Sequence, residues 1–302
     1  MENYVTAYEY ESNVNPRLKS IPVFIKNIKD CEYGINFIEL SENYNVFHKS
    51  TTPNLLASFI KLQENNYILF KDDENDDEKD LNATSHLFYI IEGKGEIRID
   101  NKTWNVSKND LLVSPSLESI YICNNSVEDL EIYYVNDSPL LNYLGSKASE
   151  KLFQTSLYSS DFIQKKLKEL SNPNNNRKGI LLSNKDTEKI GINTITPSLW
   201  CLYNELPPNT VQKPHRHNSV ALDLCIICED SENIYTLVGE EIDETGKIMN
   251  PTKIHWKKGE MFITPPGLWH SHNNVGNTFA YILPIQDAGL LLFQRILGIE
   301  LF

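Results

Sequence analysis

Short apolar stretches separated by turn-forming residues run through most of the chain, a pattern typical of a β-rich protein. Residues 1–70 mix such stretches with Asn, Ser and Pro, which predicts irregular structure with a few strands. Residues 86–116 alternate apolar and polar positions around Gly93 and Gly95, as half-buried strands and tight turns do. Strands this short and this closely spaced predict a small β-barrel or sandwich.

A different periodicity marks the middle of the chain. In residues 149–170 the apolar positions recur at roughly helical spacing, which predicts a connecting helix. The Asn-rich segment 171–178 ends this helix and is the candidate linker. After residue 180 the pattern of short strands returns.

The second half of the chain repeats the order of the first. IYTLVGEEI is followed by KIHWKKGEMFITPPGLWH, much as GEIRIDNKTW is followed by NVSKNDLLVSPSLES. A repeat of roughly 110 to 130 residues is too long for a solenoid and indicates two copies of one β-domain. We expect an N-terminal domain at 1–145, a helical connector and linker at 146–180, and a C-terminal domain at 181–302. The apolar segment 288–302 is expected to pack against the partner domain or against another subunit, and both remain open.

Charge narrows the classes of partner. The 302 residues include 28 Lys and Arg against 41 Asp and Glu, so the formal net charge of −13 disfavours nucleic acid and anionic membrane surfaces. We find neither an apolar run of membrane-spanning length nor a signal-peptide pattern, and we expect a cytoplasmic protein. Residues 71–80 hold seven acids and two lysines; a solvated loop is the favoured interpretation and a metal-binding loop the alternative, although calcium-loop spacing is lacking.

The cysteines do not form a disulfide framework, because they are five in number and scattered over a long chain. Cys225 and Cys228 form a CxxC pair inside an apolar run. On a strand their sulfurs would point to opposite faces, so we expect buried structural thiols, with redox or metal chemistry as the alternative.

Histidine is the residue type with the most informative distribution. His215 and His217 lie two residues apart, which on a strand places both imidazoles on one face, within reach of one metal ion. A second cluster contains His270 and His272 after a turn rich in Pro and Gly, and it supplies a third imidazole. An isolated HxH is often a surface pair, but three histidines from two strands would leave coordination positions open.

The two clusters together resemble the paired motifs of the cupin superfamily. The second fits G-x5-P-x-G-x2-H-x3-N at every fixed position, and HxH begins the first motif; the matching residues are Gly259, Pro265, Gly267, His270, Asn274, His215 and His217. The resemblance implies a mainly β fold: a bicupin of two β-barrel (jelly-roll, double-stranded β-helix) domains with a connecting helix. It also implies metal ligation by His215, His217 and His270.

The chain departs from the cupin pattern at one ligand. The first motif carries a Glu four or five residues after its second His, where this chain has Ala221 and Leu222. The implied centre therefore has three histidines and neutral protein ligands. That set is associated with Fe(II) dioxygenases, and Fe(II) is the expected metal, while Zn(II), Ni(II) and Mn(II) fit the same donors.

A closer resemblance covers residues 200–290, which look like gentisate 1,2-dioxygenase and its bicupin relatives. The matching stretches are LYNELPPNT, HRHNSVAL and FITPPGLWHSHNN. These relatives carry the metal in the N-terminal cupin, whereas here the histidines lie in the C-terminal half. Aligning HLFYIIEGKG with the corresponding strand places Asp80 and Asn82 at the HxH positions and Ile120 at the third His, so the N-terminal barrel is expected to be metal-free and His86 structural.

The resemblance also suggests residues around the metal. Asp223 replaces an Arg of the family and would face substrate, repelling a carboxylate, which favours an aminophenol, a neutral catechol-like ring or a cationic molecule over gentisate. Tyr203 is a second substrate-binding candidate, with a core aromatic as the alternative. His272 and Asp287 are candidate acid/base residues, against a rim histidine and a turn acid. We expect Trp269 to pack and His48 and His255 to be surface or structural residues.

Together these features predict a non-haem Fe(II)-dependent dioxygenase that uses O2 to cleave a small aromatic ring of the catechol, aminophenol or hydroxybenzoate type. Its partners would be the small-molecule substrate and O2, and a homo-oligomer, either a dimer or a tetramer, is compatible with these features. The alternative is a non-oxidative cupin, either a metal-dependent isomerase or lyase or a bicupin that binds a small molecule in its N-terminal barrel.

Overall fold

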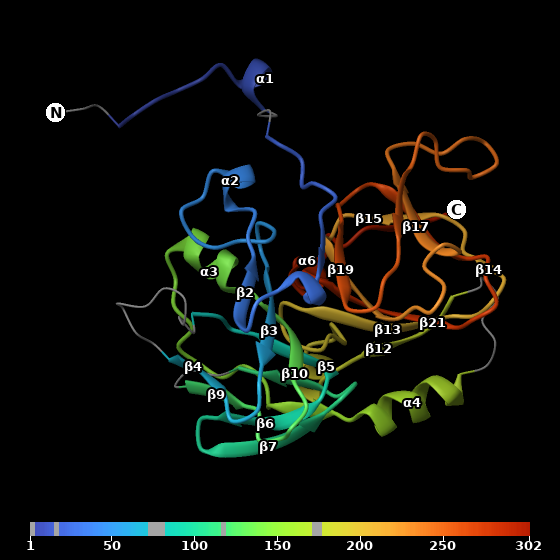
Figure 1. Cartoon of the computed structure of the whole chain (residues 1–302). Helices are drawn as coiled ribbons and strands as arrows, with labels where there is room; N and C mark the ends of the chain where they lie inside the picture. The colour runs from blue at the N-terminus through green and yellow to red at the C-terminus, as the bar shows by residue number, and fades with distance from the viewer. Residues whose placement is uncertain (1–3, 15–17, 72–81, 116–118, 171–176) are drawn as a thin grey trace.

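The computed structural model describes residues 4–14, 18–71, 82–115, 119–170 and 177–302. Four antiparallel sheets form two barrels, which Figure 1 shows at the lower left and at the right. The predicted pair of jelly-roll barrels is confirmed. Among the described residues, no helix is long and apolar enough to cross a membrane.

The N-terminal barrel consists of a six-stranded and a four-stranded sheet. In spatial order the larger sheet contains β11 (Ser156–Tyr158), β8 (Leu111–Ser114), β5 (His86–Glu92), β10 (Leu130–Asn136), β3 (Leu56–Leu62) and β2 (Gly34–Ile38). The smaller sheet contains β4 (Tyr67–Lys71), β9 (Ser119–Cys123), β6 (Lys94–Ile99) and β7 (Lys102–Ser107).

The C-terminal barrel repeats this arrangement. Both of its sheets have six strands. The counterpart of the large N-terminal sheet, called the large sheet of this barrel below, contains β1 (Ile25–Asn27), β19 (Glu260–Thr264), β16 (Ala221–Ile227), β21 (Ala280–Gln286), β13 (Trp200–Leu206) and β12 (Lys178–Leu182). Its other sheet contains β18 (Thr252–His255), β17 (Ile234–Gly239), β20 (Trp269–Asn274), β15 (His215–His217) and β22 (Ile299–Leu301), with β14 (Thr210–Val211) on β20.

Burial explains why some strands are apolar throughout and others alternate. Strand β5 is buried on both faces, because Phe88 and Ile90 point into the N-terminal barrel while Leu87 and Tyr89 belong to the core between the barrels. Strand β6 has one solvent-facing side and alternates buried with more exposed residues. The central strands of the two large sheets thus form the interface between the barrels.

Equivalent asparagines support the predicted duplication. Asn124 follows β9 and donates two hydrogen bonds from its side-chain amide, to the carbonyls of Leu62 (3.0 Å) and Glu128 (2.7 Å). Asn274 ends β20 and donates the same pair, to the carbonyls of Leu206 (3.0 Å) and Thr278 (2.8 Å). The last position of the second cupin motif is therefore a structural residue that fixes the end of a strand in both barrels.

The helices of the described residues are short, and all of them except α1 lie between strands. They are α1 (Tyr10–Asn13), η1 (Ile28–Asp30), α2 (Ser41–Tyr44), α3 (Ser138–Leu144), α4 (Ser160–Glu169), α5 (Lys185–Lys189) and α6 (Ala288–Phe293). The predicted helix over 149–170 is correct only for its second half, because Ser159 caps α4 by accepting from the N–H of Phe162 and the preceding residues pair as β11.

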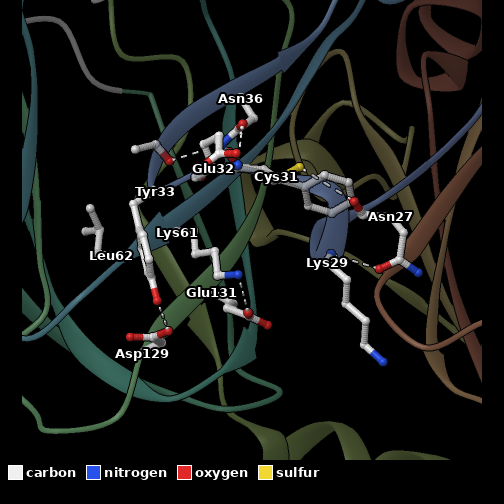
Figure 2. A network of polar contacts seen from close by, with 12 residues as sticks. Asn27, Lys29, Cys31, Glu32, Tyr33, Asn36, Lys61, Leu62, Asp129 and Glu131 are labelled. Atoms are coloured by element: carbon white, nitrogen blue, oxygen red, sulfur yellow. Dashed lines mark hydrogen bonds and ion pairs between the residues drawn. The ribbon is translucent and has the colours of Figure 1, made fainter.

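Two segments pair outside the part of the chain to which the sequence assigned them. Strand β1 precedes the N-terminal barrel but pairs with β19 of the other barrel, and β11 comes from the predicted connector yet pairs with β8. The expected boundaries at 145 and 180 therefore stay predictions. Figure 2 shows the turn that returns from β1 to β2, where Tyr33 donates to Asp129 (2.9 Å) and Lys61 pairs with Glu131 (3.8 Å).

The end of the C-terminal segment packs within its own barrel and not against the other domain. The alternative contact of residues 288–302 with another subunit stays a prediction. After α6, strand β22 pairs with β15, the strand that carries the HxH motif. Arg216 and Glu300 form an ion pair across these strands (Nη2 to Oε2, 2.6 Å), and the N–H of Phe302 donates to the carbonyl of Pro214 (3.1 Å). This last strand therefore covers the edge of the histidine-bearing strand.

Candidate metal centre

Two paired strands bring the predicted ligands together. His215 on β15 lies directly opposite His270 on β20, and their ring centroids are 4.0 Å apart. The ring of His217 is 4.8 Å from that of His270. One nitrogen of each of these three histidines lies within 4.8 Å of the others, which is the arrangement that one metal ion requires.

The turns around these strands hold the imidazoles in place. Gly267 adopts a left-handed conformation (φ 78°) that favours glycine, and its N–H donates to the carbonyl of His217 (2.7 Å). That bond ties the second motif to the first. The glycine of the motif is therefore explained by the backbone turn that it allows.

Hydrogen bonds select the ring nitrogen that is free for a metal. The Nδ1 of His217 lies 2.9 Å from the carbonyl oxygen of Ser219, and the Nδ1 of His270 lies 3.0 Å from that of Leu268. A carbonyl can only accept, so Nδ1 carries the proton in both rings. The lone pair on Nε2 is then available, as in metal-binding histidines that donate their other N–H to an acceptor.

Burial keeps these rings neutral. Desolvation lowers the pKa of His217 and, together with neighbouring histidines, lowers the pKa of His215 and His270 well below the usual value. Neutral imidazoles in a partly closed cavity fit a first-row divalent metal ion, and the three donors leave other coordination positions open. The geometry accommodates the implied metal without identifying it.

His272 lies beside this cluster and lines the same cavity. The hydroxyl of Thr236 accepts from Trp256 Nε1 (2.8 Å) and lies 2.8 Å from His272 Nδ1. Among the described contacts of Thr236, only that nitrogen can accept its proton, which places the ring hydrogen of His272 on Nε2. Burial lowers the pKa of His272 to about 3, so at neutral pH this residue is a neutral hydrogen-bond donor.

The cavity at the cluster has a volume of about 320 Å³ and is bounded on several sides. Asp223 lines it, as predicted, and is only 2% exposed; Thr264 donates to its Oδ2 (2.5 Å). Desolvation raises the pKa of Asp223 to about 7. A large share of this carboxyl is therefore protonated at neutral pH, which weakens the repulsion that we expected between Asp223 and an anionic substrate.

The raised pKa of Asp223 predicts how stability depends on pH. The folded protein holds this proton up to about pH 7, whereas the unfolded chain releases it near the ordinary value of 3.8. The contribution is thus complete below pH 4 and is lost as pH rises through 7. We expect Asp223→Asn to unfold at a higher denaturant concentration than the wild type at pH 8, by about 2 kcal/mol in unfolding free energy, and to match it near pH 4. Equal differences at both pH values would contradict this.

Arg177 is a functional candidate that the sequence analysis missed. It lies in the segment predicted as a linker, yet it lines the cavity, and its Nη2 is 3.2 Å from His215 Nδ1. Its Nε is buried and has no hydrogen-bond partner among the described residues. A guanidinium that lines a cavity is suited to bind a carboxylate there. A lone Arg after an Asn-rich run gives no local sequence signal for this role.

The structure places Tyr203 away from the cavity. Trp200, Leu202 and Asn204 line it, and because side chains alternate along β13, Tyr203 points the other way into the core between the barrels. Its hydroxyl contacts Gln164 (3.3 Å). This is the core aromatic role that the sequence analysis held as the alternative.

Asp287 is also not among the residues that line the cavity, and its hydrogen bonds connect the two barrels. It accepts hydrogen bonds from the side chain of Asn54 (2.7 Å), in the other half of the chain, and from the N–H of Val220 (2.9 Å). A carboxylate occupied in this way holds two segments together. The structure therefore gives Asp287 a positioning role in place of the predicted acid/base role.

The N-terminal barrel has apolar residues where the C-terminal barrel has histidines. Phe70 pairs with Ile120 in the same way that His215 pairs with His270. The predicted position of Ile120 agrees with this register, but the alignment of Asp80 and Asn82 with the HxH motif is wrong. That alignment counted residues back from β5. It did not allow for the connection between β4 and β5, which is longer than the connection between β15 and β16. Asp80 and the acidic segment from residue 72 lie outside the described residues.

Other singled-out residues have structural environments. His86 is fully buried, with Nδ1 2.8 Å from the hydroxyl of Tyr134, and burial lowers its pKa to about 4. Trp269 is buried beneath the guanidinium of Arg216, 4.7 Å from the ring. His255 is exposed, with Nδ1 2.8 Å from the carbonyl oxygen of Ser231.

The two sulfurs of the CxxC pair do not point to opposite faces as expected. The register of β16 against β21 shifts between Cys225 and Ile227, and this bulge brings the side chains of Cys225 and Cys228 into hydrogen-bond contact. The pKa of Cys225 is raised by burial, while the contact with Cys225 lowers that of Cys228.

Comparison with known proteins identifies the fold. No family model matches the chain, and no curated protein matches it by sequence. Among solved structures, salicylate 1,2-dioxygenase from Pseudaminobacter salicylatoxidans aligns with a TM-score of 0.72 and 12% identity, over 98% of this chain and 92% of the other. A variant of that enzyme in complex with gentisate aligns with a TM-score of 0.72 and 11% identity, over 96% and 88%.

A third similar structure is named as a globulin and not as a dioxygenase. Procruciferin, an 11S globulin from Brassica napus, aligns with a TM-score of 0.53 and 9% identity, over 82% of this chain and 78% of the other. At these identities the likeness establishes the bicupin fold, in agreement with the resemblance seen in the sequence. One fold carries proteins with different names, so the function must be argued from the site.

Proposed function

We propose that the protein is a non-haem Fe(II)-dependent dioxygenase that cleaves a small aromatic ring with O2. The observation that carries the proposal is the group of three histidines, two of them buried and one partly buried, with ligand atoms within 4.8 Å of one another, beside a cavity of about 320 Å³. The fold likeness to salicylate 1,2-dioxygenase supports the same reaction class. In such a reaction a ring C–C bond is broken and both atoms of O2 enter the product.

The residues of the cavity divide into distinct tasks. His215, His217 and His270 would hold the metal, which when bound supplies a meeting point for substrate and O2 and makes electron transfer to oxygen accessible. His272 would donate from Nε2 to a substrate oxygen. Arg177, which lines the cavity, would bind a carboxylate through its guanidinium group. The protonated form of Asp223 would donate a hydrogen bond and not repel the substrate.

These contacts favour a hydroxybenzoate-like substrate over the aminophenol or neutral catechol that the sequence analysis preferred. We expect Arg177→Leu to raise the KM for a hydroxybenzoate by about tenfold or more, since it removes one charge-assisted hydrogen bond. The KM for catechol, which has no carboxylate, should change less than twofold. Steady-state O2 uptake with both substrates measures this, and equal changes in the two KM values would argue against a carboxylate anchor.

The function itself is tested with oxygen uptake. Protein purified anaerobically and loaded with Fe(II) is assayed in an oxygen electrode with salicylate, gentisate, catechol and 2-aminophenol, and the products are examined by mass spectrometry. We expect substrate-dependent O2 consumption and a product that is heavier by two oxygen atoms. No consumption with any of these rings would overturn the proposal.

A non-oxidative metal-dependent role is the second candidate, because three neutral histidines also suit Zn(II), Ni(II) and Mn(II). Metal analysis of protein purified without added metal separates the two. Stoichiometric iron supports oxygen chemistry, and stoichiometric zinc or nickel supports an isomerase or lyase.

A further inference from the structure

A second and larger cavity opens in the N-terminal barrel. Its volume is about 830 Å³, within the range of small-molecule sites. Its position corresponds to that of the cavity beside the three histidines, called the metal-site cavity below. Leu56 and Asn136 are paired across β3 and β10 and line the N-terminal cavity. At the equivalent positions, Trp200 and Gln286 are paired across β13 and β21 and line the metal-site cavity. Phe70, the counterpart of His215, also lines the N-terminal cavity.

Aromatic side chains form part of the lining of this cavity, beside several polar ones. Phe70 and Tyr134 are almost completely buried, and Phe37 lines the cavity nearby. The amide side chain of Asn136 adds a polar group that is 4% exposed. Such a lining accommodates a flat apolar body with a few polar substituents.

In the described part of the lining, the Lys side chains have no acidic counterpart. Lys49 and Lys147 line the cavity and no Asp or Glu does so among the described residues, although the chain carries a net charge of −13. The Nζ of Lys49 lies 5.0 Å from the ring centroid of Phe37, and Lys49 forms no ion pair with a described carboxylate. Desolvation lowers the pKa of His48, which also lines the cavity. The described part of the lining therefore offers lysine side chains that could pair with an anionic ligand.

We propose that the N-terminal barrel holds a second small-molecule site, for aromatic carboxylates, that binds its ligand without transforming it. Phe70 and Ile120 replace the paired histidines of the other barrel, so this cavity lacks their metal-binding nitrogens. The aromatic side chains would contact the ring, and Lys49 would pair with the carboxylate beside Phe37. This site does not depend on the function proposed for the metal centre.

Binding is tested by ¹⁹F NMR with two probes of almost equal shape, 4-fluorobenzoate and neutral 4-fluorobenzamide. The metal-site cavity also has a cationic side chain, Arg177, so variants are needed to distinguish the two sites. Lys49→Glu and Lys147→Glu reverse charges at the N-terminal cavity, and Arg177→Leu removes the cationic side chain of the metal-site cavity. Lys102→Glu is the matched control, since Lys102 lies over Trp104, 4.1 Å from the ring centroid, and does not line the cavity.

We expect saturable binding of 4-fluorobenzoate that persists in Arg177→Leu and weakens at least tenfold in Lys49→Glu, with a smaller loss in Lys147→Glu and none in Lys102→Glu. The benzamide should bind at least tenfold more weakly than the benzoate. Equal binding of the two probes, loss of binding in Arg177→Leu, or unchanged binding in both cavity lysine variants would overturn the proposal. O2 uptake is measured separately, so failure here is distinguishable from failure of the dioxygenase proposal.

Discussion

Replacing His217 with Ala is expected to reduce the affinity of the protein for its metal by more than about 100-fold, because it removes one of the three imidazole ligands and no neighbouring group takes its place. His217 lies on the inner face of β15, its Nδ1 proton is bound by the carbonyl of Ser219 (2.9 Å), and its Nε2 is available to a metal. Metal content after loading and gel filtration should fall from about one equivalent to below a tenth. O2 uptake should fall with it.

Two control variants make the result specific. His255→Ala removes an exposed histidine from β18 and should leave the metal content unchanged. His272→Ala removes a histidine that lines the same cavity but is not one of the three grouped ligands, so metal should be retained while turnover falls. Full metal content in folded His217→Ala, checked by circular dichroism, would contradict the three-histidine centre.

Local spacing in the sequence was enough to find the group of three histidines. His215 and His217 share a face because side chains alternate along a strand, and His270 is placed by a turn that needs Gly267. The alternation of side chains and the conformation of the turn both depend on residues that are close together in the sequence. The expected opposite orientation of Cys225 and Cys228 was wrong for a related reason, since it assumed a regular strand where β16 has a bulge.

Features that depend on distant segments could not be predicted. Arg177 reaches the cavity only because β12 pairs with β13, and Asp287 binds Asn54, which lies more than 200 residues away in the sequence. The misplacement of Asp80 and Asn82 has the same origin, because counting along the chain cannot replace the pairing of Phe70 with Ile120. Which residues share a site across the barrels follows from the packing of the two large sheets.

Asp137 and Asp287 show how the barrels are joined. Each directly follows the equivalent strand, β10 or β21. Asp287 accepts from Asn54, two residues before β3, and Asp137 accepts from Ser198 (2.6 Å), two residues before β13. The interface is therefore roughly two-fold symmetric, with one buried carboxyl from each half bound by the other.

The Asp137 contact is expected to contribute strongly to stability. Its carboxyl also accepts from Thr84, through both N–H and hydroxyl, and from the N–H of Ser85 (3.0 Å). Asp137→Ala would leave these donors and Ser198 without their acceptor, and we expect a loss of about 3–5 kcal/mol in unfolding free energy. Asp287→Ala removes fewer bonds and should cost about 2 kcal/mol.

Urea unfolding of both variants measures the effect, with Asp129→Ala as the control because Asp129 accepts one bond from Tyr33 at an exposed site. The control should lose less than about 1 kcal/mol. A loss in Asp137→Ala no larger than in the control would contradict the role of this carboxyl as a link between the barrels. Both variants should keep the metal affinity of the wild type while folded, since neither carboxyl lines the metal-site cavity. Lost turnover in a fully folded, metal-loaded Asp287→Ala would instead restore the acid/base role predicted from the sequence.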